Sequence, residues 1–267
     1  MLPIAARGDT AGAVQAGDSL SGAATLDDSP TAAALALQQR VGGTLHALCA
    51  ESWVLRVRNF RPGGADFDEA WAAHPPERRE VVVFGRRCFE NRFSRAYGRA
   101  YAYSGQVAAA TPFAESAVAA ELLERCNAAC FGDGGGGAFN ACLANWYEPA
   151  HHIARHRDDE RALDAAAPVA SVSWGAPRRF VVRPRGGGES LDLVLGDGDL
   201  LVMGGACQRT HTHEVPKPRR KDRLPPGRRV SWTFRRFLDA PPPRRLRAPP
   251  RPEKRRRRDG DDRGPSR

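Results

Sequence analysis

The stretch LDLVLGDGDLLVM, which runs from Leu191 to Met203, decides the fold class of this chain. Two short apolar runs flank a Gly-Asp-Gly sequence, which is the pattern of two strands joined by a turn. Similar runs lie outside the stretch, at Val81–Phe84, Ala170–Trp174, Phe180–Arg183 and Val230–Phe234. Several of them alternate apolar and polar residues, as half-buried antiparallel strands do. Short strands separated by Gly and Asp turns predict a sandwich, a barrel or a jelly roll.

One segment, Ala114–Cys130, has the spacing of a helix instead. Its apolar residues recur at helical intervals, and a glycine-rich run over residues 132–137 ends it. We therefore predict a mainly β protein with flanking helices, of the α+β class, folded over residues 41–239. The first forty residues are rich in Ala, Gly, Ser and Asp and contain no aromatic residue. This composition predicts a disordered leader over residues 1–40.

The chain carries a formal net charge of +10, and most of it lies in the tail, residues 240–267. The tail holds eleven basic and four acidic residues together with seven prolines, which predicts disorder. Its basic run Lys254–Arg258 resembles a nuclear localisation signal or a nucleic-acid-binding tail. We expect a nuclear protein, with the cytoplasm as the alternative. No apolar run approaches the ~18 residues of a membrane span, so we expect no membrane partner. We also expect the protein to be a monomer.

Two histidines and one carboxylate could form a metal site. His156 and Asp158 lie two residues apart, and on an extended segment such residues point to the same side. Together with His213 they match the triad of non-haem Fe(II) oxygenases. Other histidines compete for this role, namely His151, His152 and His211. His152 and His156 could also hold zinc from one face of a helix, although Pro149 disfavours a helix there.

The segment Arg229–Arg235 reads Arg-Val-Ser-Trp-Thr-Phe-Arg. As a strand, it would carry its polar side chains on one face and its apolar side chains on the other. The polar face consists of Arg229, Ser231, Thr233 and Arg235. Arginines on an inward-pointing face are unfavourable unless a buried anion meets them, and a dicarboxylate cosubstrate would supply that anion. The alternative is an exposed basic edge strand.

Short motifs run in a fixed order through residues 80–237. They are Val83-Phe-Gly85, Arg92, Tyr97-Gly98, Tyr101-Ala-Tyr-Ser-Gly105, Asn145-Trp-Tyr147, His156-Arg-Asp158-Asp-Glu160, Ala170-Ser-Val-Ser-Trp-Gly175, Arg179-Phe180, Gly198-Asp-Leu-Leu-Val-Met203, His213-Glu-Val-Pro-Lys217 and the Arg229–Arg235 segment. In order and spacing they resemble the AlkB family of Fe(II)- and 2-oxoglutarate-dependent dioxygenases. Within that family they resemble the eukaryotic nucleic-acid-repair branch.

The resemblance implies a double-stranded β-helix (jelly-roll) core and the use of Fe(II), 2-oxoglutarate and O2. It implies that His156, Asp158 and His213 bind the iron and are the catalytic residues. The expected reaction is oxidative demethylation of bases such as 1-methyladenine and 3-methylcytosine in DNA or RNA. In that reaction 2-oxoglutarate is decarboxylated and formaldehyde is released, which would make this a DNA alkylation repair enzyme.

The resemblance also assigns residues to the two organic substrates. Those expected to contact 2-oxoglutarate are Asn145, Tyr147, Ser231 and Thr233, with Arg235, or else Arg229, for its far carboxylate. Those expected to contact the nucleic acid are Arg92, Tyr101, Tyr103, Asp159 and Glu160. Tyrosines among arginines suit base stacking and phosphate contacts, and the basic segment between His213 and Arg229 suits the phosphate backbone.

Two positions depart from the family pattern. His211 stands where an aromatic residue is expected, so it could compete with His213, and Ser231 stands where relatives often carry Asn. Two other functions stay open: a 2-oxoglutarate oxygenase that acts on a protein or lipid, and a non-catalytic nucleic-acid-binding relative. The tyrosines, the basic segment and the full set of iron ligands and arginines argue against both.

Overall fold

The structure, a computed structural model, describes residues 30–61, 66–83, 85–103, 106–132 and 138–239 of the chain. The basic tail with Lys254–Arg258, Phe84 and most of the glycine-rich run lie outside the described residues, so the predictions made for them remain predictions. No helix within these ranges is long and apolar enough to cross a membrane.

Two sheets make up most of the fold. The larger sheet has the strand order β1 (Thr44–Cys49), β2 (Ser52–Val57), β14 (Asp199–Gly205), β11 (Val169–Gly175), β16 (Arg229–Arg235), β9 (Ala141–Tyr147), β5 (Phe93–Tyr97) and β8 (Ala110–Thr111). The smaller sheet has the order β10 (Ile153–His156), β15 (His211–Val215), β12 (Arg178–Pro184) and β13 (Leu191–Leu195). Two hairpins accompany them, β3 (Glu80–Val83) with β4 (Arg86–Phe89) and β6 (Tyr101–Tyr103) with β7 (Gln106–Ala108).

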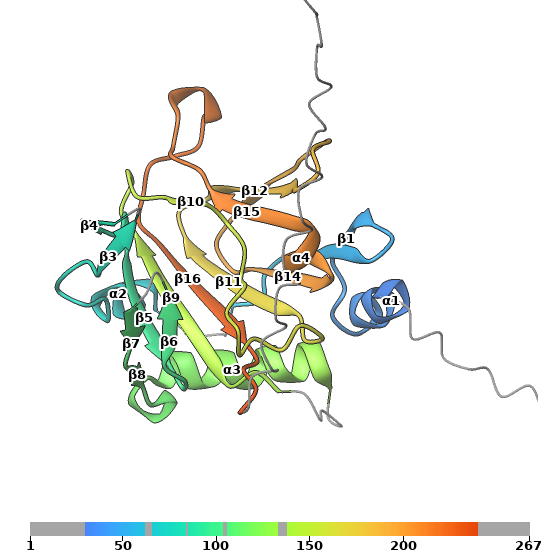
Figure 1. Ribbon diagram of the computed structural model, residues 1–267, viewed down its shortest axis with the longest axis horizontal. Helices are drawn as coiled ribbons and strands as arrows, with labels where there is room; N and C mark the ends of the chain where they lie inside the picture. The colour runs from blue at the N-terminus through green and yellow to red at the C-terminus, as the bar shows by residue number, and fades with distance from the viewer. Residues whose placement is uncertain (1–29, 62–65, 84, 104–105, 133–137, 240–267) are drawn as a thin grey trace, which may run out of the picture.

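The two faces of the larger sheet bury different partners. Alternate residues such as Trp174 and Trp232 form one core with the helices α1 (Pro30–Val41), α2 (Phe67–Ala72) and α3 (Ala117–Phe131). Figure 1 shows α3 lying across this sheet. The opposite face packs on the smaller sheet, where Leu201 and Met203 of β14 meet Phe180 of β12. The predicted mainly β, jelly-roll type of fold is confirmed, and each strand predicted from the sequence is present within two residues of its expected ends.

The start of the predicted ordered region and the start of the predicted helix need correction. The leader is not disordered throughout, because residues 30–41 form α1 and bury Ala34 and Leu37 in the core. These two residues lie three apart in an alanine-rich segment, which favours a helix with one apolar face. The helix predicted over Ala114–Cys130 is confirmed as α3, but it begins at Ala117, because the Ser116 hydroxyl accepts a hydrogen bond from the Ala119 N–H and caps it.

The strand β16 lies between β11 and β9 and is buried along its whole length. Its apolar residues face the helices, because Val230, Trp232 and Phe234 belong to that core. Its polar residues must therefore face the smaller sheet, as the alternation predicted. The alternative of an exposed edge strand is wrong.

Candidate iron and cosubstrate site

The structure brings His156, Asp158 and His213 together. Strand β10 pairs with β15 so that His156 stands opposite His213, and Asp158 follows two residues after the end of β10. The two imidazole ring centroids are 4.4 Å apart, and one ligand atom from each of the three side chains lies within 4.8 Å of the others. Two imidazoles and one carboxylate at this spacing fit a facial triad, so these residues can hold Fe(II).

Both histidines are held in the neutral form that binds a metal. The Nδ1 of His156 lies 2.8 Å from the Ala154 carbonyl, so Nδ1 carries the proton and Nε2 is left with its lone pair for a metal. Burial lowers the pKa of His156. Burial and the nearby His156 lower the pKa of His213 to about 3. A metal therefore displaces no proton from either ring at neutral pH.

The third member of the triad, Asp158, is held by Arg235. The guanidinium donates from Nε to one carboxylate oxygen at 2.9 Å and from Nη2 to the other at 3.0 Å. Burial raises the pKa of this carboxyl, but the charge and hydrogen bonds of Arg235 outweigh burial and lower it overall. Gln208 also fixes the segment, because its side-chain oxygen accepts the Asp158 N–H at 3.0 Å.

The competing histidines lie outside this cluster. His152 precedes the extended strand β10 and does not lie on a helix, so the zinc site predicted as an alternative for His152 and His156 is wrong. His211 is buried, and its Nδ1 lies 2.7 Å from the Thr210 hydroxyl oxygen. His151 packs against the ring of Phe93.

At the other end of β16, Arg229 is 1% exposed. Its Nη2 donates to the Ser173 hydroxyl at 2.8 Å, and its guanidinium lies 5.2 Å from the centre of the Tyr147 ring. Its Nε and Nη1 have no hydrogen-bond partner among the described residues. Burial lowers the pKa of Arg229 to about 10. A buried cation with two donors left over is a site for an anion.

The different contacts of Arg235 and Arg229 correct the residue expected to bind the far carboxylate of 2-oxoglutarate. Arg235 was expected to bind it, but two of its donors are used by Asp158. The geometry therefore favours Arg229, the alternative left by the sequence. The prediction failed because Asp158 lies 77 residues before Arg235, and the sequence does not show that the two side chains meet.

Asn145 and Tyr147 lie beside β16, opposite Ser231 and Arg229 respectively. The side-chain oxygen of Asn145 accepts a hydrogen bond from Arg92 at 2.7 Å, which leaves its NH2 group as the donor for a cosubstrate oxygen. Arg92 itself is buried and also donates to Glu90. It was predicted to contact nucleic acid, but its contacts make it a residue that orients Asn145.

Hydroxyl groups line the same face between the two arginines. The Ser171 Oγ lies 3.1 Å from the Ser231 Oγ and 3.2 Å from the Thr233 Oγ1. Neither Ser171 nor Ser173 was selected from the sequence. The alternation in Ala170–Trp174 could have revealed them, because a polar face on a central strand points to a site.

The structure gives the remaining predicted substrate residues different degrees of support. Asp159 and Glu160 border a cavity of about 180 Å³ together with Asp158. Asp159 is exposed and pairs with Arg157 at 2.8 Å. Strand β6 contains Tyr101 and Tyr103, but their side chains lie outside the described part of the chain. Contact of these four residues with nucleic acid stays a prediction.

Comparison with known proteins places these residues in a family. A sequence model described as the 2OG-Fe(II) oxygenase superfamily matches residues 67–235. Several similar proteins are named DNA oxidative demethylase ALKBH2. The protein from Mus musculus is 36% identical over 60% of this chain and 67% of its own length. The protein from Homo sapiens is 37% identical over 59% and 61%, and that from Arabidopsis thaliana is 29% identical over 70% and 66%. This chain thus spans 61% to 67% of their lengths.

Proposed function

Because the chain belongs to the AlkB family within the 2OG-Fe(II) oxygenase superfamily, we propose that it demethylates nucleobases in nucleic acid by oxidation. The chain is a dioxygenase that uses Fe(II), 2-oxoglutarate and O2. The observation that carries the proposal is the His-Asp-His cluster with the buried, incompletely bonded Arg229 on the same internal face. The ALKBH2 proteins, which are named as DNA oxidative demethylases, supply the substrate class.

The residues of the chain divide the work along β16. His156, Asp158 and His213 hold iron at one end, where Arg235 keeps the carboxylate ionised. When bound, iron would activate O2 with 2-oxoglutarate as the electron donor, which is chemistry that side chains do not provide. At the other end Arg229 receives the far carboxylate of 2-oxoglutarate. The methyl carbon on the base nitrogen would take one oxygen atom of O2 and leave as formaldehyde when its C–N bond breaks, while 2-oxoglutarate takes the other oxygen atom and becomes succinate and CO2.

Asn145 and the hydroxyls between the two ends orient the cosubstrate. Arg92 binds the side-chain oxygen of Asn145, so its NH2 group is left to donate to the cosubstrate. Ser231 and Thr233 are linked through Ser171, which fixes the three hydroxyls on this face. The hydroxyls can adjust to either a donor or an acceptor, because a hydroxyl is both.

Nucleic-acid binding is supported by the segment that joins β15 to β16, residues 216–228, here called the basic loop. Six of its thirteen residues are basic and one is acidic. Each of the six basic side chains is exposed. The loop starts three residues after His213 and ends next to Arg229, so cations that contact phosphates would lie beside the site. Asp159 or Glu160 would accept hydrogen bonds from the exocyclic amine of the base.

A panel of oligonucleotides tests this function. Purified protein is incubated with Fe(II), ascorbate and 2-oxoglutarate and with single- or double-stranded DNA or RNA that carries 1-methyladenine or 3-methylcytosine. We expect loss of the methyl mass with formaldehyde and succinate in equal amounts. Turnover of 2-oxoglutarate without demethylation of any oligonucleotide would instead favour a protein or lipid substrate. The same panel ranks DNA against RNA.

A further inference from the structure

A single acidic residue, Asp222, fastens the basic loop to the smaller sheet. It ends the short 3-10 turn η2 (Arg220–Asp222). One of its oxygens accepts the Arg219 backbone N–H at 3.0 Å, and the other accepts the Arg219 side chain at 3.1 Å. The second oxygen also receives Nη1 of Arg179 at 3.3 Å, although Arg179 belongs to β12. The Asp222 side chain is therefore only 9% exposed on an otherwise exposed loop.

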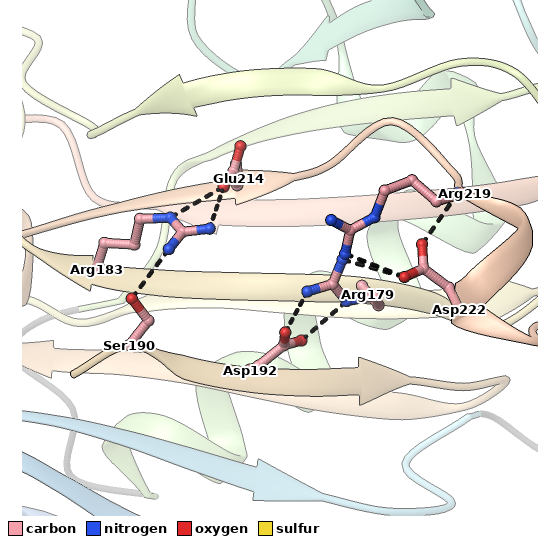
Figure 2. Close-up of polar contacts among 7 residues, drawn as sticks. All are labelled: Arg179, Arg183, Ser190, Asp192, Glu214, Arg219 and Asp222. Carbon is pink, nitrogen blue, oxygen red and sulfur yellow. Dashed lines mark hydrogen bonds and ion pairs between the residues drawn. The ribbon is translucent and has the colours of Figure 1, made fainter.

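The sheet side of this contact is itself fixed. Figure 2 shows Arg179 between Asp222 of the loop and Asp192 of the neighbouring strand β13. Nε of Arg179 donates to one oxygen of Asp192 at 3.2 Å, and Nη2 donates to the other. Further along the same strands, Arg183 donates to Glu214 and Ser190. Arg179 thus offers the loop a guanidinium whose direction is set by the sheet.

Three basic side chains of the anchored turn are exposed to solvent. Arg220, Lys221 and Arg223 are exposed, and no ion pair or hydrogen bond joins their side chains to the residues that the structure describes. Arg223 has φ 52°, in the left-handed region that non-glycine residues avoid. Such a conformation persists where the surroundings impose it, and it is found at ligand-binding segments. Figure 1 shows the orange loop projecting from the sheets.

We propose that Asp222 is a positioning residue for nucleic acid: it fixes the basic loop so that Arg220, Lys221 and Arg223 meet phosphates in a preformed arrangement. The inference rests on the proposed function, since it concerns the same substrate. An acid inside a phosphate-binding loop is unfavourable by Coulomb's law, so its presence needs a reason. Arg179 and Arg219 neutralise its charge. Because the loop is already ordered, the entropy cost of ordering it does not reduce the affinity for nucleic acid.

One substitution changes the affinity for oligonucleotides in opposite directions, depending on whether Asp222 positions the loop or acts only through its charge. Asp222→Asn removes a negative charge and frees two arginines, so electrostatics alone predicts tighter binding of oligonucleotides. Positioning predicts weaker binding, by roughly fivefold, as for the loss of a turn cap. The matched control is Glu51→Gln, which removes one negative charge beside another arginine, Arg209, and contacts neither Arg179 nor the loop. It should leave binding unchanged or tighten it.

Fluorescence anisotropy with the full chain and a labelled oligonucleotide measures both variants against wild type. The slope of log affinity against log salt should also be shallower for Asp222→Asn, by about one for each phosphate that the loop no longer reaches. The thermal midpoint and the KM for 2-oxoglutarate should stay near wild type in both variants, because neither residue touches the site. Binding by Asp222→Asn as tight as wild type, with an unchanged salt slope, overturns the inference alone. Wild-type protein that binds no oligonucleotide overturns the proposed function and the inference together.

Discussion

Arg229 and Arg235 stand at the two ends of β16 and point to the same side of the strand. Both are buried, at 1% and 4% exposure, yet their surroundings differ. Arg235 shares two hydrogen bonds with Asp158, so each charge has its partner within the chain. Arg229 has one hydroxyl and one aromatic ring beside it, and two of its nitrogens have no hydrogen-bond partner among the described residues.

The different partners of the two arginines show which end of the site has its charges paired within the protein. The iron end holds a neutralised pair that keeps a metal ligand in place before any metal arrives. The cosubstrate end holds a cation whose pKa burial lowers to about 10, a sign that its charge is not yet compensated. An incoming carboxylate would supply the compensation. Each prediction below perturbs one of the two ends.

Loss of an iron ligand should have the largest effect. We expect His156→Ala or Asp158→Ala to reduce 2-oxoglutarate turnover by well over roughly 100-fold, since removal of even an outer partner of a metal ligand can cost that much. Succinate formation in the presence of a methylated oligonucleotide measures this. His152→Ala is the matched control and should keep its activity, because His152 lies outside the cluster. Full activity in Asp158→Ala would contradict the iron site.

Loss of a charge at either end should affect stability unequally. Arg235→Met leaves the Asp158 carboxylate buried and unpaired, which should lower the free energy of unfolding by about 3–5 kcal/mol. Arg229→Met removes a cation that forms no ion pair with the residues that the structure describes, so the change should be smaller than about 1 kcal/mol or even stabilising. Urea unfolding of the metal-free proteins without 2-oxoglutarate compares them. Equal losses would mean that Arg229 has a counter-ion of its own.

The stability of the metal-free protein should fall as the pH is lowered. In the unfolded chain His213 takes up a proton near pH 6.5, whereas burial in the folded chain delays this to about pH 3. The unfolded state therefore binds more protons between these values, and the free energy of unfolding decreases by about 2 kcal/mol between pH 7 and pH 5. Urea unfolding with a chelator present measures it. The decrease should be smaller in His213→Gln, and an identical decrease would assign it to other groups.

The sequence predicted one part of the site better than another. The alternation in Arg229–Arg235 identified the buried polar face, because side chains on a strand alternate whatever the rest of the fold does. The same alternation placed His156 and Asp158 on one side of an extended segment. Both predictions depended on geometry within a few residues of chain, whereas His213 was selected from the competing histidines by the family resemblance.

The failures depended on contacts between distant segments. Asp158 determines that Arg229, and not Arg235, keeps free donors. Arg92 was assigned to the nucleic acid because its partner Asn145 lies 53 residues away and the sequence does not show their contact. The leader was judged to be disordered from its composition, although burial of Leu37 against the larger sheet stabilises α1. Packing of this kind overrides local composition.

The division of work along β16 is tested most directly by the dependence of demethylation on 2-oxoglutarate. Formaldehyde release from a methylated oligonucleotide is measured for wild type and for Arg229→Met as 2-oxoglutarate is raised. We predict a KM for 2-oxoglutarate at least about 30-fold higher in the variant, the effect of removing one partner of a buried charge pair, with activity partly recovered at saturation. A KM equal to that of wild type would contradict this account and would indicate that Arg235 binds the far carboxylate of 2-oxoglutarate.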